Sequence, residues 1–265
     1  MNLQMHLAVA LCLFSSIATV SCFAPSPSSN TRTRSSSSQL SAATKERQPW
    51  DVLRFVQQSS KFVSFPFVPS SSKSKQSVKP GDILWQPASS SFQWAPLDDV
   101  VMGGASKSNL DNASGLWKGS VTDANNGGFV GVRTTPNLKL DLTQCQGLEW
   151  TFQTSEKMPK RLKVVLRDST DFNGIAWTAS VDIPNNTFGG GKGKQVKVRL
   201  PVNRKSLVPT KFASIVKDPS TAGGIDKSGI TALQMVYSKF EYEGELNPKF
   251  KAGDFDLQLL QVKAY

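Results

Sequence analysis

Histidine and cysteine are scarce in this sequence, and their scarcity excludes several kinds of catalytic and metal site. The 265 residues contain one histidine, His6, and three cysteines, Cys12, Cys22 and Cys145. His6, Cys12 and Cys22 lie in a segment that we expect to be cleaved, so the mature chain is expected to lack imidazole. It then cannot use a Ser-His-Asp or Cys-His mechanism or build a histidine-bearing zinc or iron site. Cys145 is left without a disulfide or Cys-x-x-Cys partner, and we expect it to be a small buried hydrophobe.

Most of the net positive charge lies in the first 80 residues, ahead of the segment whose pattern predicts a globular domain. The formal net charge is +11, of which residues 1–45 carry +3, residues 46–80 carry +4 and residues 81–265 only +4. The globular part therefore lacks the dense basic patch that phosphate contacts need, and no nucleic-acid partner is expected.

The first 45 residues have the composition of a two-step targeting sequence. An apolar run from Leu7 to Val20, followed by small residues, predicts a signal peptide over 1–22. The Ser-rich, Arg-bearing, acid-free tract that follows predicts a transit-peptide-like leader over 23–45. The junction Ser21-Cys22-Phe23-Ala24-Pro25 resembles the bipartite plastid presequence of algae with secondary plastids. We expect a plastid protein, with a mitochondrial or secretory destination as the alternative.

Residues 46–67 show a helical hydrophobic period, and residues 68–80 form a Ser- and Lys-rich stretch typical of a flexible linker. The predicted apolar face of the amphipathic helix runs through Val52, Phe55, Val56, Ser59, Phe62 and Val63. Asp51, Arg54, Gln58 and Lys61 share the predicted polar face. This helix could dock on the following domain, lie on a membrane surface through residues 49–67, or enter a groove of a partner.

Residues 81–265 alternate between apolar and polar positions and contain no convincing long helix. This pattern predicts an all-β domain, an antiparallel sandwich, over the whole of 81–265. Strands are predicted at 148–152, 162–166, 196–200 and 255–259, with shorter ones at 116–121, 129–134, 175–181 and 233–240.

The stretch from Trp94 to Ser106 crowds aromatic, acidic, apolar and paired glycine residues into a few positions ahead of this pattern. Gly103 and Gly104 can reach positive φ and allow backbones to approach, which predicts a tight corner between two strands, and we expect Gly104 to need positive φ. Asp98 and Asp99 could cap this corner with hydrogen bonds to the backbone. Alternatively, these acids and Ser106 belong to a loop that meets a ligand or partner.

The run Asp98-Asp99-Val100-Val101-Met102-Gly103-Gly104-Ala105-Ser106, with Asn126-Gly127-Gly128-Phe129 and Arg133 after it, resembles the complex I intermediate-associated protein 30 family. The resemblance extends from about Trp85 to Tyr265. It implies a galactose-binding-like jelly-roll sandwich that assists the assembly of membrane electron-transfer complexes. The residues that it nominates for partner binding are Asp98, Asp99, Met102, Gly103, Gly104, Ser106, Gly127, Gly128, Phe129 and Arg133.

Three other features could carry chemistry. The loop Gly189–Lys194 lacks the spacing and the following helix of a phosphate-binding loop, so we interpret it as a hairpin loop. Acidic side chains could join Asp98 and Asp99 around a calcium ion, but their spacing matches no calcium-binding loop and favours solvated turn positions. These acids are Asp168, Asp171 and Asp182.

Four tryptophans could stack on sugar rings or fill the core; they are Trp94, Trp117, Trp150 and Trp177.

These observations favour a non-catalytic assembly factor without a cofactor, whose partners are subunits or assembly intermediates of a membrane protein complex. That complex would be a complex I-like NADH dehydrogenase or a photosynthetic complex. A jelly-roll carbohydrate-binding module is the alternative function. An enzyme that uses a carboxylate pair such as Asp98 with Asp168 is the third class considered.

Overall fold

Alternating apolar side chains give two antiparallel sheets that share one core. The computed structural model describes residues 49–62, 75–88, 91–155, 159–184, 193, 195–218 and 223–265. All of these lie in one compact unit, residues 44–265. The predicted signal peptide and leader, and the glycine loop 189–194 apart from Gly193, lie outside the described residues.

One sheet has seven strands, in which every neighbouring pair is antiparallel. Its order is β13 (Ser214–Ile215), β12 (Val208–Lys211), β10 (Ala176–Asp182), β9 (Arg161–Arg167), β14 (Ala232–Ser238), β6 (Phe129–Thr135) and β3 (Gln93–Pro96).

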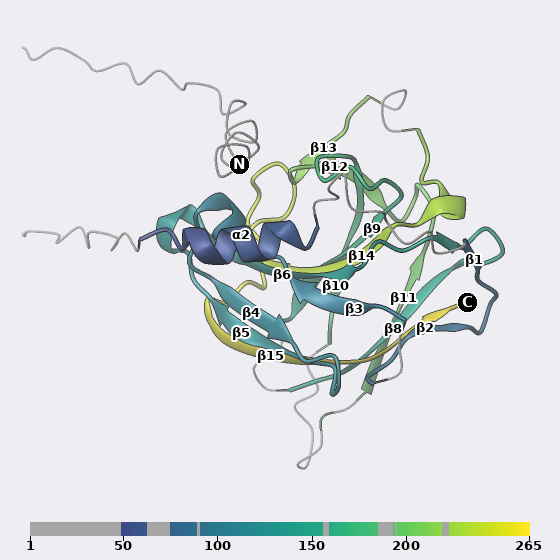
Figure 1. Ribbon diagram of the computed structural model, residues 1–265, viewed down its shortest axis with the longest axis horizontal. Coiled ribbons are helices and arrows are strands. Elements are labelled where there is room, and N and C mark those ends of the chain that lie inside the picture. The colour runs from purple at the N-terminus through teal and green to yellow at the C-terminus, as the bar shows by residue number, and fades with distance from the viewer. Residues whose placement is uncertain are drawn as a thin grey trace, which may run out of the picture. The chain divides into compact units, whose positions relative to one another are not determined.

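The other sheet has six strands and is also antiparallel. Its main path is β11 (Gln195–Pro201), β8 (Gly147–Gln153), β15 (Gly253–Ala264), β5 (Leu116–Val121) and β4 (Lys107–Leu110), while β2 (Ile83–Trp85) pairs with the end of β15. The two sheets are visible in Figure 1, one containing β4, β5 and β15 and the other β6, β9 and β14.

Short elements complete the described chain. Within residues predicted as linker, β1 (Gln76–Ser77) pairs in parallel with β7 (Leu140–Asp141). Three short 3-10 helices lie in the connections: η1 (Asp99–Met102), η2 (Ala124–Asn126) and η3 (Lys227–Gly229). One α-helix, α2 (Val52–Ser60), is shorter than the predicted 46–67 within the described residues and begins after the cap Asp51, whose carboxylate accepts from Arg54 N–H.

The core lies between the two sheets, and its largest side chains are tryptophans. Trp94 of β3 and Trp150 of β8 come from opposite sheets, and their ring centroids lie 6.0 Å apart. Trp85 meets the edge of Trp94 at 6.1 Å. Aromatic pairs of this kind add about 0.5–1.5 kcal/mol beyond their buried area. The predicted all-β antiparallel sandwich is confirmed, as are the eight strands predicted for it.

Candidate functional site

The corner predicted at Gly103 and Gly104 joins the two sheets. The chain leaves β3 of the seven-stranded sheet, makes the single turn η1 and enters β4 of the six-stranded sheet. Gly103 ends this turn with φ of 85°, a left-handed conformation that glycine adopts without steric cost. Asp98 caps the start of the turn and Asp99 is its first residue, while Ser106 follows the turn just ahead of β4.

Asp99 fastens the corner to the start of β6. Its carboxylate accepts hydrogen bonds from Ser106 N–H at 2.9 Å and from the Ser106 hydroxyl at 2.6 Å. It also accepts from Gly128 N–H at 2.8 Å and Phe129 N–H at 3.3 Å. Four donors around one buried carboxylate compensate for its removal from water. Segments that are about 30 residues apart in sequence are thereby held together.

Asp98 has a similar set of donors and is also buried. Its carboxylate accepts from Ser108 N–H at 2.9 Å, the Ser108 hydroxyl at 2.6 Å and Gly131 N–H at 3.3 Å. Burial raises the pKa of Asp98, and the hydrogen bonds from Ser108, Gln58 and Gly131 oppose that rise. The buried charge is thus tolerated only because these donors stay in position.

Gln58 of α2 docks the helix on this carboxylate. Its side-chain N–H donates to Asp98 Oδ2 at 3.1 Å, and its carbonyl oxygen accepts from Asp98 N–H at 2.8 Å. At the N-terminal end of α2, the indole N–H of Trp50 donates to Val100 O at 2.9 Å, and the Arg54 guanidinium donates to Ser106 O. The helix therefore docks on the sandwich, which was one of the three positions considered for it.

The docked face of α2 differs from the predicted apolar face. Phe55, Gln58 and Phe62 are buried, whereas Val52 and Val56 are exposed. Gln58 was assigned to the polar, outward face, and the structure corrects this because two hydrogen bonds to Asp98 make it the central docking residue. The rotation leaves apolar side chains on the outer side of the helix. In Figure 1, α2 lies on the side of the sandwich where β3, β4 and β6 are found.

The outward side chains of α2 and η1 form what we call the apolar patch, defined by Val52, Leu53, Val56 and Met102. Leu53 is 71% exposed and Met102 is 75% exposed. The two elements are in contact, and Trp50 lies against Gly103 at the end of η1. Met102, nominated by sequence for partner binding, is thus on the surface, whereas Asp98, Asp99 and Ser106 are buried beneath it.

The glycines of the family motif make room for Asp99. A Cβ atom at Gly104 would overlap the Asp99 carboxyl group, and one at Gly127 would overlap Asp99 Oδ2. Positive φ is found at Gly103 and at Gly128, where it is 132°, but not at Gly104. The expectation that Gly104 needs positive φ is therefore corrected: its requirement is close approach to a buried side chain.

Arg133 lies on the outer face of the seven-stranded sheet, away from the core. Its guanidinium carbon lies 5.2 Å from the ring centroid of Phe62 and 5.2 Å from that of Phe172. Arg133 Nε donates to Gln234 Oε1 at 3.0 Å. Phe62 extends from the end of α2, so Arg133 contacts the helix as well as the sheet.

The tryptophans considered for sugar stacking all belong to the core. Trp94, Trp117, Trp150 and Trp177 are each 3% exposed or less. The indole N–H of Trp177 donates to Asp168 Oδ2 at 2.9 Å, which gives that aspartate a structural role. No ring face of these four residues is available to a ligand, so the sugar-stacking interpretation of them is corrected. Cys145 is buried and free, as expected, with its thiol against Val78 O at 3.3 Å.

The acids considered for calcium are dispersed. Asp182 is bound by Arg161 and Lys249, and Asp171 is used in the turn before β10. Among the described residues, no three or more histidine, cysteine or acidic side chains gather where they could hold a metal ion. The Asp98 carboxylate is also occupied by its own donors, so its pairing with Asp168 for catalysis has no geometric support.

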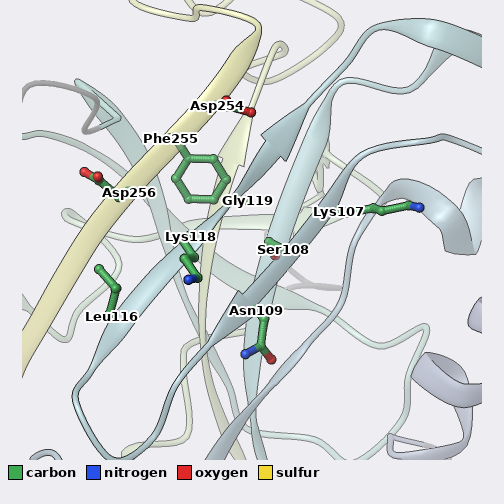
Figure 2. Close-up of a pocket in the computed structure, with 9 residues that line it drawn as sticks. All are labelled: Lys107, Ser108, Asn109, Leu116, Lys118, Gly119, Asp254, Phe255 and Asp256. Atoms are coloured by element: carbon green, nitrogen blue, oxygen red, sulfur yellow. The ribbon is translucent and has the colours of Figure 1, made fainter.

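A groove of about 530 Å³ runs along the outer side of β4, β5 and the start of β15. Figure 2 shows its lining, in which Lys107 points away from the Phe255 ring. The groove carries Lys107 and Lys118 together with Asp254 and Asp256. Charges of both signs at an open surface do not select an ion or build an acid-base pair, so we assign no ligand to it.

The sequence interpretation missed Trp50, Arg54, Gln58 and Ser108 as parts of this site. A signal for Ser108 was present, because Ser106 and Ser108 are two residues apart and side chains at that spacing share one face of an extended segment, where each binds one of the two adjacent aspartates. Gln58 gave no such signal, since a polar residue in an amphipathic helix ordinarily faces water.

Comparison with known proteins links this architecture to a family. The model of the family described as Complex I intermediate-associated protein 30 (CIA30) matches residues 83–259. No curated protein matches the chain.

Similar solved structures are distant. The family 11 carbohydrate-binding module of cellulosomal cellulase Lic26A-Cel5E of Clostridium thermocellum is 12% identical, with a TM-score of 0.40 over 71% of this chain and 96% of that chain. A family 11 module from Clostridium thermocellum in complex with a beta-1,3-1,4-mixed-linked tetrasaccharide is 11% identical, with a TM-score of 0.37 over 65% and 87%. The agarase AgWH50C is 13% identical, with a TM-score of 0.37 over 71% of this chain and 26% of its own.

The family match covers both halves of the aspartate and glycine motif and most of the sandwich, and it confirms the resemblance noted in the sequence. The chain belongs to the complex I intermediate-associated protein 30 family.

Proposed function

We propose that this chain is a non-catalytic assembly factor that binds subunits or assembly intermediates of a membrane electron-transfer complex through the apolar patch on α2 and η1. Family membership supports a role related to complex I assembly in general. The client would be a complex I-like NADH dehydrogenase or a photosynthetic complex.

The observation that carries this proposal is the exposure of the apolar patch on a rigidly held surface. Leu53 and Met102 are large apolar side chains that are about three-quarters exposed, and Val52 and Val56 of the same helix as Leu53 are about half exposed. Exposed apolar side chains gathered on two elements in contact are typical of protein interaction sites.

The buried aspartates hold this surface in one conformation. Asp98 binds Gln58 of α2, and Asp99 binds the two sides of the corner that carries Met102. A partner then loses little ordering entropy when it binds, because the loop and the helix are already fixed. Asp98, Asp99, Gly104 and Gly127 contribute to binding by shaping the surface.

Contact with a membrane is a related part of the proposal. Among the described residues, no helix has the length and apolar composition needed to cross a bilayer. The outward apolar side of α2 suits shallow contact with a membrane surface, which would bring the protein to membrane-embedded clients. The leader composition supports delivery to a plastid by a bipartite presequence, with a mitochondrion or the secretory pathway as the alternative.

Co-purification from detergent-solubilised organelles tests the patch. We expect Leu53→Glu and Met102→Glu each to reduce recovery of membrane-complex intermediates by at least about tenfold, because a charge would be desolvated in the interface. Leu246→Glu is the matched control, since Leu246 is also an exposed leucine, 64% accessible, and lies outside the patch. Recovery that is equal for all three variants would contradict the proposal.

Vesicle flotation separates binding to a client from binding to lipid. If Leu53→Glu loses flotation with protein-free vesicles but keeps its client in detergent, the patch acts on the membrane and the protein-binding role of the patch is wrong. Loss of the client in detergent supports the role proposed for it.

A further inference from the structure

The outer face of the seven-stranded sheet carries two buried arginines close together. Arg133 of β6 lies directly across from Gln234 of β14, and Gln234 lies directly across from Val165 of β9. Arg167 lies two residues after Val165 on the same face of the sheet. Arg133 is 7% exposed and Arg167 is 6% exposed.

Most of the Arg133 guanidinium is in contact with other groups, but one edge is not. Its Cζ lies 5.2 Å from the ring centroids of both Phe62 and Phe172, and its Nε–H donates to Gln234. In the described part of the chain, no oxygen accepts a hydrogen bond from its terminal nitrogens Nη1 and Nη2, and no carboxylate forms an ion pair with it. These nitrogens are not among the fully buried atoms that lack a partner, so they keep access to solvent and can accept a ligand, while the rest of the side chain is buried.

Other arginines on the strands show what this edge lacks. Arg161 binds Asp182 through two nitrogens, at 2.6 Å and 2.9 Å. Arg199 has an aromatic ring, Tyr265, on one face at 5.0 Å and a carboxylate, Glu149, at 2.7 Å from its Nε. Arg199 thus also combines an aromatic ring with a hydrogen-bonded Nε, but its side chain is exposed and its partner is a carboxylate, whereas Arg133 is buried and its Nε partner is a neutral amide.

Arg167 is fixed beside Arg133 by backbone carbonyls. Its Nη2 donates to the carbonyl oxygens of Asp171 at 2.5 Å, Phe172 at 3.3 Å and Gly174 at 3.1 Å. The loop that supplies these carbonyls also supplies the Phe172 ring over Arg133. Burial, together with the charge of Arg167, lowers the pKa of Arg133 to about 9. A negative charge at this position would offset both effects.

We propose that Arg133, with Arg167 beside it, binds a carboxylate group that an acidic side chain of the client supplies. The rings of Phe62 and Phe172 lie beside the guanidinium, and the Arg133 terminal nitrogens, which have no acceptor among the described residues, are left to bind a ligand. A planar carboxylate forms two parallel hydrogen bonds in that geometry. The proposal rests on the proposed function, because the carboxylate comes from the same partner that covers the apolar patch, and Phe62 extends from the end of α2 toward Arg133.

An NMR titration tests the site without the client. The probe is sodium acetate, added at constant ionic strength with sodium chloride, and the signal is the Nε–Hε resonance of Arg133, assigned by its loss in Arg133→Lys. We expect a saturable shift for Arg133 and little shift for Arg199, whose Nε is already engaged by Glu149. No shift with acetate would overturn the proposal. Saturation by inorganic phosphate at a lower concentration than by acetate would overturn the assignment to a carboxylate.

Co-purification then tests the source of the carboxylate. Arg133→Lys keeps the charge but removes the pair of terminal nitrogens, and we expect it to recover at least about fivefold less client than Arg161→Lys, a control of the same type on β9. Arg133→Gln is a second variant that also removes the buried charge, and thermal unfolding establishes that each variant is folded. Full recovery with both Arg133 variants, together with loss in Leu53→Glu, would overturn this inference and leave the proposed function intact. Loss in the Arg133 variants with full recovery in Leu53→Glu would support the carboxylate site and contradict the patch.

Discussion

Gly104 lies against the Asp99 carboxylate, so adding a single methyl group at this position should change the stability of the fold. We expect Gly104→Ala to destabilise the fold by about 3 kcal/mol or more, because the added Cβ displaces Asp99 from its four donors and leaves buried polar groups unpaired. The free energy of unfolding, measured by urea denaturation, gives the value.

Gly224→Ala is the matched control for this change. Nothing lies within 4 Å of the position where its Cβ would be placed, and its φ is not positive. We expect a change within about 0.5 kcal/mol there. A Gly104→Ala protein as stable as the Gly224→Ala protein would mean that Asp99 is not the reason for glycine at this position.

The sequence could predict which residues belong to the corner, but only partly what each of them does there. Paired glycines after two acids indicated a corner with capping carboxylates, and the structure has this arrangement. The sequence could not tell which glycine takes positive φ and which makes room, because that depends on Asp99 folding back over residues five positions further along the chain. Arg133 was nominated by the family pattern alone, since the rings that lie beside it come from distant segments.

At the scale of one element, α2 is held mainly by Gln58. We expect Gln58→Ala to release the helix, because it removes both hydrogen bonds to Asp98 and leaves a buried carboxylate with fewer donors. Hydrogen exchange of the amides of residues 52–60 should then rise by at least about tenfold, since an isolated helix of nine residues is marginal in water.

The neighbouring Gln57→Ala gives the control for the helix. Gln57 is exposed, so the substitution changes the same residue type on the same turn without touching Asp98. Protection that falls equally in both variants would show that helix propensity, and not docking, sets the stability of α2.

The helical spacing of apolar residues predicted a helix in this segment, and the structure has one that begins after its N-cap, Asp51. Which face of the helix packs on the sandwich could not be predicted from that spacing. An apolar stripe ordinarily faces the core, but here two hydrogen bonds to a buried carboxylate turn the polar residue Gln58 inward. The two valines and Leu53 consequently face outward, which is why the apolar patch was not foreseen as a surface feature.

The whole sandwich was the most predictable level of the structure. Alternation over β8, β9 and β15 places one set of side chains in the core, and period-two patterns of this kind leave few alternatives to a sheet. Strands of two to four residues, such as β7 and β13, are too short to show a period. The sequence left two roles for the tryptophans, in the core or in a sugar-binding site. Burial of an indole depends on the opposite sheet, and the pattern of a single strand carries no information about that sheet.

Acid should destabilise the whole molecule partly through Asp182, which joins β9 and β10 to the segment before β15. Hydrogen bonds from Arg161 and then Lys249 hold the pKa of Asp182 well below its usual 3.8. A carboxylate with a lowered pKa stabilises the folded state above pH 3.8, and this contribution is lost as the pH falls through the lowered value. Asp98 acts in the opposite direction, because its raised pKa favours the folded state at low pH and costs stability as the pH rises.

We expect Asp182→Asn to reduce the free energy of unfolding at pH 7 by about 0.5–1 kcal/mol, since the pair is exposed and screened by solvent. The difference from the unmodified protein should shrink toward zero below about pH 3. Urea denaturation at pH 7, 5, 4 and 3, with Asp254→Asn as a charge-removal control on β15, measures this; a difference that widens in acid would mean that Asp182 is stabilised by something other than its two cations.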